Sequence, residues 1–394
     1  MNTNQEIYLD YQATTPVDQR VLDAMEPWLR DQFGNAASRS HAFGWEAGKA
    51  VEEARTILAN GIGGQPREIT FTSGATESNN LALLGCARAC KERGMHLISA
   101  RTEHKSVLEP LEALQAEGFE VTWLDVDREG HLKATQLEAA LRPDTTLVSL
   151  MHGNNEVGTL HPIHELGTIC QQHGAFFHCD ATQTFGKEPI NVAENGIDLL
   201  SASAHKMHGP KGVGILWIKS RPQVPFAPLM YGGGHERGIR PGTLNVPGIV
   251  GMGEAFQVTH ESQSAEQNSI RNLRDALWEK LESIEGCTLN GSSSSRLAGN
   301  LNVSFKHVDG EALLASLEGI AASTGSACTS AELAPSHVLL AMGAESATAR
   351  GSIRFSLGRG NTAAEIEWVA KRTQEEVKRL RELSPLHKMA QETQ

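Results

Sequence analysis

Short segments that suit β-strands alternate with helical segments over the first 220 or so residues, and this alternation constrains the fold more than any other feature. The strand candidates are apolar and rich in β-branched or aromatic residues. They cover residues 68–72, 96–100, 120–124, 147–151, 175–179, 199–203 and 213–218. Helical segments separate most of them, at 77–93, 107–117, 137–141 and 163–173. The repetition predicts an α/β fold with a mostly parallel seven-stranded sheet between helices, and ligands are expected at the carboxyl ends of its strands.

The pattern changes after about residue 255, where a second, smaller unit is predicted. The polar segment 259–269 is expected to lead into a long helix, in which apolar residues recur at helical spacing: Leu273, Leu277, Leu281 and Ile284. Further strands are predicted at 300–305 and 352–355, a loop at 290–296, and helices at 311–317 and 363–383. We expect a large domain of residues 15–263 and a small α+β domain formed by residues 1–14 and 264–394.

The composition is that of a soluble globular protein, with 40% hydrophobic and 21% charged residues. The net charge of −12 argues against direct nucleic-acid binding, which needs a basic surface. The N-terminus lacks the pattern of a secretory signal, and no apolar stretch is long enough to cross a bilayer. The six cysteines show no C-x-x-C spacing, so no metal site is predicted. We expect a cytoplasmic protein with reduced thiols and no membrane partner.

A lysine and an aspartate follow the ends of two neighbouring predicted strands. Lys206 ends the sequence SAHK, where partial desolvation would free its amine for Schiff-base chemistry. Asp180 follows the preceding strand and could pair with a pyridinium nitrogen, as enzymes that use pyridoxal 5′-phosphate (PLP) require. Each residue also has an ordinary interpretation, Lys206 as a surface lysine and Asp180 as a helix N-cap.

Two further strand ends suit the same kind of cofactor. The segment TSGATES (72–78) combines small residues with a helix start, which favours a phosphate, although Thr76 could equally be a capping residue. His104 could stack on a planar ring, although it could also be a polar loop histidine. Together with Lys206 and Asp180, these segments place a phosphate cup, an acid, a lysine and a planar ring at successive strand ends, which is what a PLP site needs.

One cysteine stands apart from the others. Cys328 lies in the small, polar run STGSACTS (323–330), whereas structural cysteines usually lie in apolar segments. We therefore expect Cys328 to be an exposed, reactive thiol. Cys86 and Cys90 lie four positions apart on one helix face and are predicted to be packing residues.

With these residues in view, the chain resembles the cysteine desulfurases, which are PLP fold-type-I enzymes of aminotransferase class V. Within that family it is similar to the branch that serves iron–sulfur assembly and nitrogen fixation. The motifs that carry the resemblance are jointly specific and cover nearly the whole chain. They are YLDYQATTP (8–16), FGNAASRSH (33–41), FTSGATESNN (71–80), TEHKSVL (102–108), HGNNEVG (152–158), DATQTFGK (180–187), SAHKMHGPKG (203–212), GGGHERGIRPGT (232–243), STGSACTSAELAPSH (323–337) and SIRFSLGR (352–359).

The resemblance implies roles around the cofactor. Lys206 would bind PLP covalently and later move the Cα proton of the substrate. His104 would stack on the ring and act as an acid or base, Asp180 would pair with the ring nitrogen, and Gln183 would pair with the phenolic oxygen. The other cofactor-binding residues that the resemblance implies are Ala75, Thr76, Ser203 and His205 for the phosphate, Thr243 from the second subunit of a homodimer, and Asn155.

The resemblance also implies a substrate and a reaction. Asn155 and Arg354 would bind the carboxylate of L-cysteine, with help from Asn35. Cys328 would be the nucleophile that takes the substrate sulfur as a persulfide, leaving alanine. The sulfur would pass to an acceptor protein, either an iron–sulfur scaffold or a thiolation or DNA sulfur-modification protein. Housekeeping members of the family carry a longer C-terminal tail for the scaffold, so the acceptor stays open here.

Two other functions are alternatives. A selenocysteine lyase or an aminotransferase would share the PLP site, but an aminotransferase would not need Cys328. A non-catalytic sulfur carrier or regulator with a vestigial PLP site is the other alternative, although no residue that turnover needs is missing.

Overall fold

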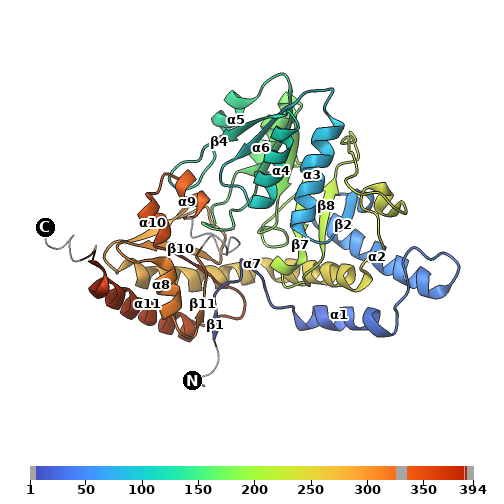
Figure 1. Cartoon of the computed structure of the whole chain (residues 1–394). Helices are drawn as coiled ribbons and strands as arrows, with labels where there is room; N and C mark the ends of the chain where they lie inside the picture. The colour runs from blue at the N-terminus through green and yellow to red at the C-terminus, as the bar shows by residue number, and fades with distance from the viewer. Residues whose placement is uncertain (1–5, 325–334, 386, 388–394) are drawn as a thin grey trace.

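Seven strands form a mostly parallel sheet in the larger part of the molecule, in the order β2-β8-β7-β6-β5-β3-β4 (Figure 1). The structure is a computed structural model that describes residues 6–324, 335–385 and 387. The strands are β2 (Ile69–Thr72), β3 (His96–Ala100), β4 (Glu120–Leu124), β5 (Thr145–Met151), β6 (Phe176–Asp180), β7 (Leu199–Ser203) and β8 (Gly214–Ile218). Strand β8 is antiparallel to both of its neighbours, and the others run in one direction. Their carboxyl ends therefore meet at one edge of the sheet.

Helices cover both faces of this sheet because successive strand residues point to opposite sides. On β7, Leu199 belongs to the apolar cluster under the helices of one face, whereas Leu200 belongs to the cluster on the other face. The helices of the first face are α3 (Ala75–Ala89) and α4 (Lys105–Ala116). The helices of the second face are α2 (Ala42–Gly61), α5 (Ala134–Ala140) and α6 (Ile163–His173).

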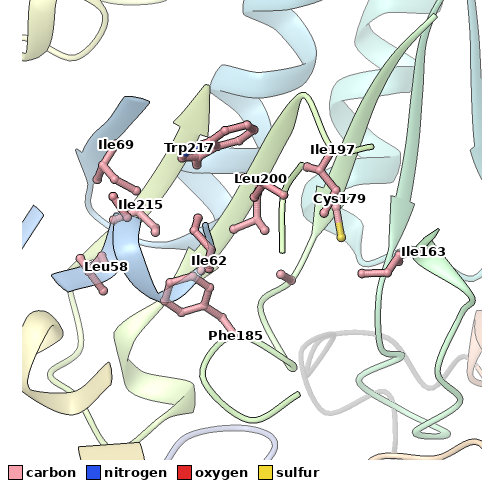
Figure 2. Close-up of a cluster of buried hydrophobic side chains, with 14 of the residues drawn as sticks. Leu58, Ile62, Ile69, Ile163, Cys179, Phe185, Ile197, Leu200, Ile215 and Trp217 are labelled. Atoms are coloured by element: carbon pink, nitrogen blue, oxygen red, sulfur yellow. The ribbon is translucent and has the colours of Figure 1, made fainter. Parts of the chain in front are cut away.

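The second face has the larger apolar core. Figure 2 shows part of it, with Leu58 and Ile62 from the end of α2 facing Ile69 on β2 and Ile215 on β8. Phe185 is almost completely buried beside them. Each fully buried side chain of this size contributes roughly 1.5–3 kcal/mol by leaving water. This burial holds the sheet rigid, so the polar residues at its carboxyl edge have fixed positions.

A smaller unit has a sheet of its own, in the order β12-β10-β9. Its elements are β9 (Cys287–Asn290), β10 (Asn300–Phe305), β12 (Ser352–Ser356), α8 (Gly310–Ser316), α9 (His337–Ala341), α10 (Ser346–Arg350) and α11 (Ala363–Leu383). The N-terminal strand β1 (Ile7–Tyr8) pairs in parallel with β11 (Ile320–Ala321), and Leu9 packs into the core of this unit. Both ends of the chain therefore contribute to one core, while the predicted boundaries at residues 14 and 263 stay predictions.

A single long helix joins the two parts. Helix α7 (Val246–Glu282) has 37 residues and packs on α2 and on α1 (Gln19–Arg30) at one end and on α11 at the other. In Figure 1 it runs without a break beneath the large sheet into the smaller unit. No helix in the described ranges is long and apolar enough to span a membrane.

The α/β fold predicted from the sequence is confirmed, and each of the seven predicted strands exists within two residues of its expected bounds. The segment 259–269 is a correction, because it lies inside α7 rather than before it. Its polarity reflects a helix that bridges two units and exposes much of its surface between them. Ile284 lies just beyond the end of α7, and strand β9 was missed because its four residues are short and half-exposed. The five cysteines that the structure describes are free thiols, and Cys86 and Cys90 are buried as predicted.

Candidate active site

A cavity of about 580 Å³ lies at the carboxyl edge of the large sheet. Its lining comes from the strand ends, from the start of α3, from the N-terminal segment and from β12. Ten residues that the sequence singled out line it together: Ala75, Thr76, His104, Asn155, Asp180, Gln183, Ser203, His205, Lys206 and Arg354. The position agrees with the rule that open α/β sheets bind ligands outside the carboxyl ends of their strands.

Lys206 ends the short 3₁₀ helix η2 (Ala204–Lys206), which directly follows β7. Its Nζ donates hydrogen bonds to the carbonyl oxygen of Gln12 at 2.5 Å and to that of Ala13 at 2.7 Å. The N-terminal segment thus runs across the site and fixes the position of the amine. An amine held in this way can be delivered to a carbonyl group in the cavity.

Asp180 is the last residue of β6 and is almost fully buried. One carboxylate oxygen accepts from the backbone N–H of Thr182 at 2.9 Å and from its hydroxyl at 2.5 Å. The other accepts from Asn79 Nδ2 at 2.8 Å. These bonds orient the carboxylate toward the cavity, where it can accept a hydrogen bond from a protonated ring nitrogen.

The start of α3 offers backbone N–H groups to the cavity. Its N-cap is Gly74, with a φ of 153°, and no side chain caps the helix. Ser73, Thr76 and Ser203 line the same part of the cavity. An uncapped helix N-terminus with hydroxyl groups beside it suits a phosphate, because the N–H groups and the helix dipole both favour an anion.

The carboxylate of Glu77, in the first turn of α3, is compensated by a positive charge, which reduces its repulsion of an anion at this site. Glu77 forms an ion pair with Arg240 at 2.8 Å, and it also accepts from the backbone N–H of Ser73. Burial by itself would raise the pKa of Glu77, but the hydrogen bonds from Arg240 and Ser73 hold the pKa below its usual value. Nearby, burial together with the charges of Lys206 and Lys211 lowers the pKa of His205 to about 4, so His205 is neutral at pH 7.

Arg354 reaches the cavity from β12 of the smaller unit and is nearly fully buried. Its Nη1 donates to the carbonyl oxygen of Asn155 at 2.7 Å, and its Nη2 pairs with Asp10 at 2.8 Å. Its Nε is buried and has no hydrogen-bond partner within the described chain. A guanidinium with an unused donor beside a polar cavity can bind a carboxylate.

Two predicted residues that the structure describes do not line the cavity. Asn35 is exposed, and its side chain accepts a hydrogen bond from the backbone N–H of Ala37. Thr243 is also exposed, three residues beyond Arg240. Cys328 lies outside the described residues.

Several contributors to the site had no role in the sequence-based prediction. They are Asp10, Gln12, Ala13 and Thr14 from the N-terminal segment, Asn79 from α3 and Ser106 from α4. The only available signal was their presence in the motifs YLDYQATTP, FTSGATESNN and TEHKSVL. Their contacts join segments far apart in the sequence, so spacing alone could not assign them.

The residues of the cavity fit PLP. The uncapped start of α3 suits the phosphate, the amine of Lys206 suits the aldehyde, and the acceptor on Asp180 suits the ring nitrogen. The Oε1 atom of Gln183 is buried with no hydrogen-bond partner among the described residues, although it lies on a cavity-lining side chain. Buried polar atoms are normally paired, so this one also indicates a missing polar ligand.

Comparison with known proteins agrees with this site. The aminotransferase class-V family model matches residues 7–369. A cysteine desulfurase IscS of Anaeromyxobacter sp. (strain Fw109-5) is 52% identical over 387 residues, which is 98% of this chain and 96% of the relative. The mitochondrial cysteine desulfurase of Saccharomyces cerevisiae is 51% identical over 386 residues, covering 98% of this chain and 78% of the relative.

Solved structures are similar as well. A NifS-like protein has a TM-score of 0.88 and 40% identity, covering 94% of this chain and 98% of that one. DndA from Streptomyces lividans has a TM-score of 0.77 and 42% identity, covering 89% of this chain and 99% of that one. The chain therefore belongs to the PLP-dependent aminotransferase class-V family and, within it, to the cysteine desulfurases.

Proposed function

We propose that this protein removes sulfur from L-cysteine, releasing alanine and leaving a persulfide on Cys328. The observation that carries the proposal is the single cavity that Lys206, Asp180 and Arg354 share with the uncapped start of α3. The names of the relatives support it, and one related structure is described as SspA in complex with cysteine, with 39% identity and a TM-score of 0.80.

Two charged residues would divide the work of binding and proton transfer. PLP bound in the cavity would supply an electron sink for the substrate Cα. Lys206 Nζ would carry the cofactor and then accept the Cα proton, since both tasks need an amine at one point of the cavity. Arg354 would bind the substrate carboxylate with its fork, assisted by Asn155, and would thereby orient the Cα–H bond.

The sulfur transfer needs a thiolate as the nucleophile. The Cys328 thiolate would attack the substrate sulfur, so that a sulfur–sulfur bond forms as the bond between Cβ and sulfur breaks. The electron pair of the broken bond stays on the carbon side, where protonation gives alanine. The assignment of Cys328 rests on its sequence STGSACTS and on the resemblance, because it lies outside the described residues.

A homodimer is part of the proposal, with Thr243 completing the phosphate site of the second subunit and Asn35 assisting substrate binding. Supporting it, large apolar side chains are exposed on the segments that carry these two residues. They are Leu22, Leu29, Phe33, Phe43, Trp45, Met230 and Tyr231. Scattered exposed apolar residues are common, but several large ones on neighbouring segments are typical of an interface. Sedimentation of the holoenzyme at one subunit mass would contradict the dimer.

A sulfur-acceptor protein would receive the persulfide. The relatives named IscS support an acceptor in iron–sulfur assembly, and the similarity to DndA leaves a thiolation or DNA sulfur-modification protein as the alternative. A pull-down that traps mixed disulfides at Cys328 would distinguish these acceptors. A cytoplasmic location stays a prediction.

The decisive experiment compares two cysteine variants. Cys328→Ala is expected to abolish sulfide release from L-cysteine while the visible absorption of the bound cofactor persists. Cys287→Ala is the matched control, because Cys287 is another free thiol whose pKa burial raises to about 12, and it should keep full activity. Full activity of Cys328→Ala would refute the role of Cys328. Borohydride reduction followed by peptide mass mapping should label Lys206, and an unlabelled Lys206 would refute the cofactor attachment.

A further inference from the structure

His104 is the N-cap residue of α4, and this position restricts where its ring can carry a proton. The backbone N–H of Ser106 donates a hydrogen bond to His104 Nδ1 at 3.1 Å. The direction of this bond is fixed, because a backbone N–H can only donate. Nδ1 must therefore present its lone pair, and a neutral ring must carry its proton on Nε2.

A second set of hydrogen bonds, through Asn79 and Ser106, also favours an unprotonated Nδ1 on His104. Asn79 Nδ2 donates to Asp180 at 2.8 Å and to Ser106 Oγ at 2.9 Å. A carboxylate only accepts, so the contact with Asp180 fixes which end of the Asn79 amide is the nitrogen. Since Ser106 Oγ accepts from Asn79, its own hydrogen is available for His104 Nδ1, which lies 2.8 Å away.

We infer that His104 works as a neutral imidazole with its proton on Nε2, and that Asn79 is a positioning residue that maintains this state through Ser106. Asn79 is completely buried and Ser106 nearly so, so few water molecules can compete for these atoms. The consequences for catalysis rest on the proposed function, whereas the protonation state of the ring does not.

The charges around His104 are compatible with a neutral ring. Burial is the largest effect and lowers the pKa of His104. Asp180 on β6 and Glu109 on α4 favour the charged form, while Lys206 on η2 and His337 on α9 oppose it. The positive end of the α4 dipole also opposes an imidazolium at the N-cap. A histidine at a helix N-terminus in triosephosphate isomerase is kept neutral in the same way.

This state narrows what His104 can do in the cavity. Nδ1 already accepts from Ser106, so Nε2 is the ring nitrogen that remains for the cavity, and it is a hydrogen-bond donor. A donor can stabilise developing negative charge, but it cannot accept the proton of a thiol. If the inference holds, the acid–base role that the resemblance implies becomes hydrogen-bond donation, and another group would take the thiol proton.

The direct test is nitrogen NMR of the holoenzyme labelled with ¹⁵N in its histidine rings. His104→Gln identifies the His104 signals by their loss. We expect a ring that is protonated on Nε2 and unprotonated on Nδ1 at pH 7, and that becomes charged only below the ordinary histidine pKa of about 6.5. A charged ring at pH 7, or a neutral ring with its proton on Nδ1, would overturn the inference.

The positioning role of Asn79 has its own variant. In Asn79→Ala, Ser106 Oγ becomes free to accept from a protonated Nδ1, so the pKa of His104 should rise by about 1. Asn80→Ala is the control, because Asn80 is the next residue on α3 and its side chain donates to the carbonyl oxygen of Thr76 instead. An unchanged His104 titration in folded Asn79→Ala would refute the role of Asn79, and the wild-type spectrum keeps the tautomer testable if that variant does not fold.

Rates of sulfide release by two variants distinguish a hydrogen-bond donor from a base at position 104. Glutamine keeps an N–H donor, whereas leucine keeps only the bulk, so His104→Gln should release sulfide at least 10-fold faster than His104→Leu. Equal losses in both variants would contradict the donor role. The NMR measurement needs no substrate, so a wild-type enzyme that releases no sulfide would refute the proposed function without deciding the tautomer.

Discussion

Arg354 Nη2 lies 2.8 Å from a carboxylate oxygen of Asp10, although 344 residues separate the two in the chain. The ion pair joins the strand β12 to the N-terminal segment that also contacts Lys206. Because Arg354 is nearly fully buried, Asp10 keeps its charge compensated when no substrate carboxylate is bound. The pair therefore holds the guanidinium in position for an incoming carboxylate.

Replacing the guanidinium with an ammonium tests its role in substrate binding. Arg354→Lys should raise the KM for L-cysteine roughly 10- to 100-fold, because lysine cannot form the two-pronged contact with a carboxylate. Steady-state kinetics of sulfide release measure this change. Arg350→Lys, an exposed arginine four residues earlier, is the control and should leave the KM unchanged. An unaltered KM in Arg354→Lys would mean that the carboxylate binds elsewhere.

A buried ion pair should anchor the glycine-rich segment that precedes Thr243. Glu236 forms a two-pronged pair with Arg55 on α2, at 2.8 and 3.0 Å, and also accepts from the backbone N–H of Phe71 on β2. Glu236→Gln would leave the buried Arg55 cation with only the exposed Glu52 as an ion-pair partner, so the free energy of unfolding should fall by about 3 kcal/mol. Urea denaturation followed by circular dichroism measures it.

The matched control for this pair lies on the surface. Glu117 pairs with Arg88, and both side chains are 39% exposed. Glu117→Gln should change the free energy of unfolding by less than about 1 kcal/mol, since solvent screens such pairs. If Glu236→Gln loses no more stability than Glu117→Gln, the buried pair does not anchor the segment.

Acid should destabilise the fold through its buried histidines. Burial lowers the pKa of His161 to about 3, and both of its ring nitrogens are buried without hydrogen-bond partners in the described structure. Between that value and the ordinary pKa of about 6.5, the unfolded chain binds a proton that the folded chain does not. Above pH 6.5 both states are neutral at this ring, so His161 contributes no dependence of stability on pH there. At pH 5, proton uptake by the unfolded chain should lower the free energy of unfolding by about 2 kcal/mol.

Urea midpoints measured at pH 7 and pH 5 test this effect. His161→Leu should reduce the difference between the two midpoints, because it removes the group that takes up the proton. His173→Leu, at an exposed position on α6, should keep the wild-type difference. Equal pH dependence in both variants would show that His161 is not a source of acid sensitivity.

The close approach of β8 to the start of α3 predicts a glycine requirement. A Cβ on Gly214 would lie 2.6 Å from the carbonyl oxygen of Ala202 and 2.7 Å from the Cα of Gly74. Both contacts are with backbone atoms, so Gly214→Ala must push β8 away from the N-cap of α3. Overpacking of this kind costs about 1–3 kcal/mol, and we expect PLP to be retained at least 10-fold less tightly.

Cofactor retention after dialysis, followed by its visible absorption, measures the loss. Gly48→Ala on α2 is the control, since its Cβ would meet no atom closer than 3.4 Å and alanine favours a helix. Unchanged retention in Gly214→Ala would show that the start of α3 tolerates the shift.

The sequence alone determined the order of strands and helices, because buried strands and amphipathic helices leave their periods in the order of apolar residues. It also indicated Lys206 and Asp180, since residues that follow parallel strands collect at one edge of the sheet. The continuity of α7 through the polar residues 259–269 was not predictable, because packing against both units stabilises that part of the helix.

Only the tertiary structure decided which groups hold the site in its working state. Asp10 meets Arg354, Gln12 meets Lys206, and Asn79 reaches both Asp180 and Ser106. These partners come from segments with no fixed spacing between them, and any of many polar residues could have taken their places. Hydrogen bonds are short and directional, so the proton on His104 depends on the fold that brings Ser106 and Asn79 to its ring.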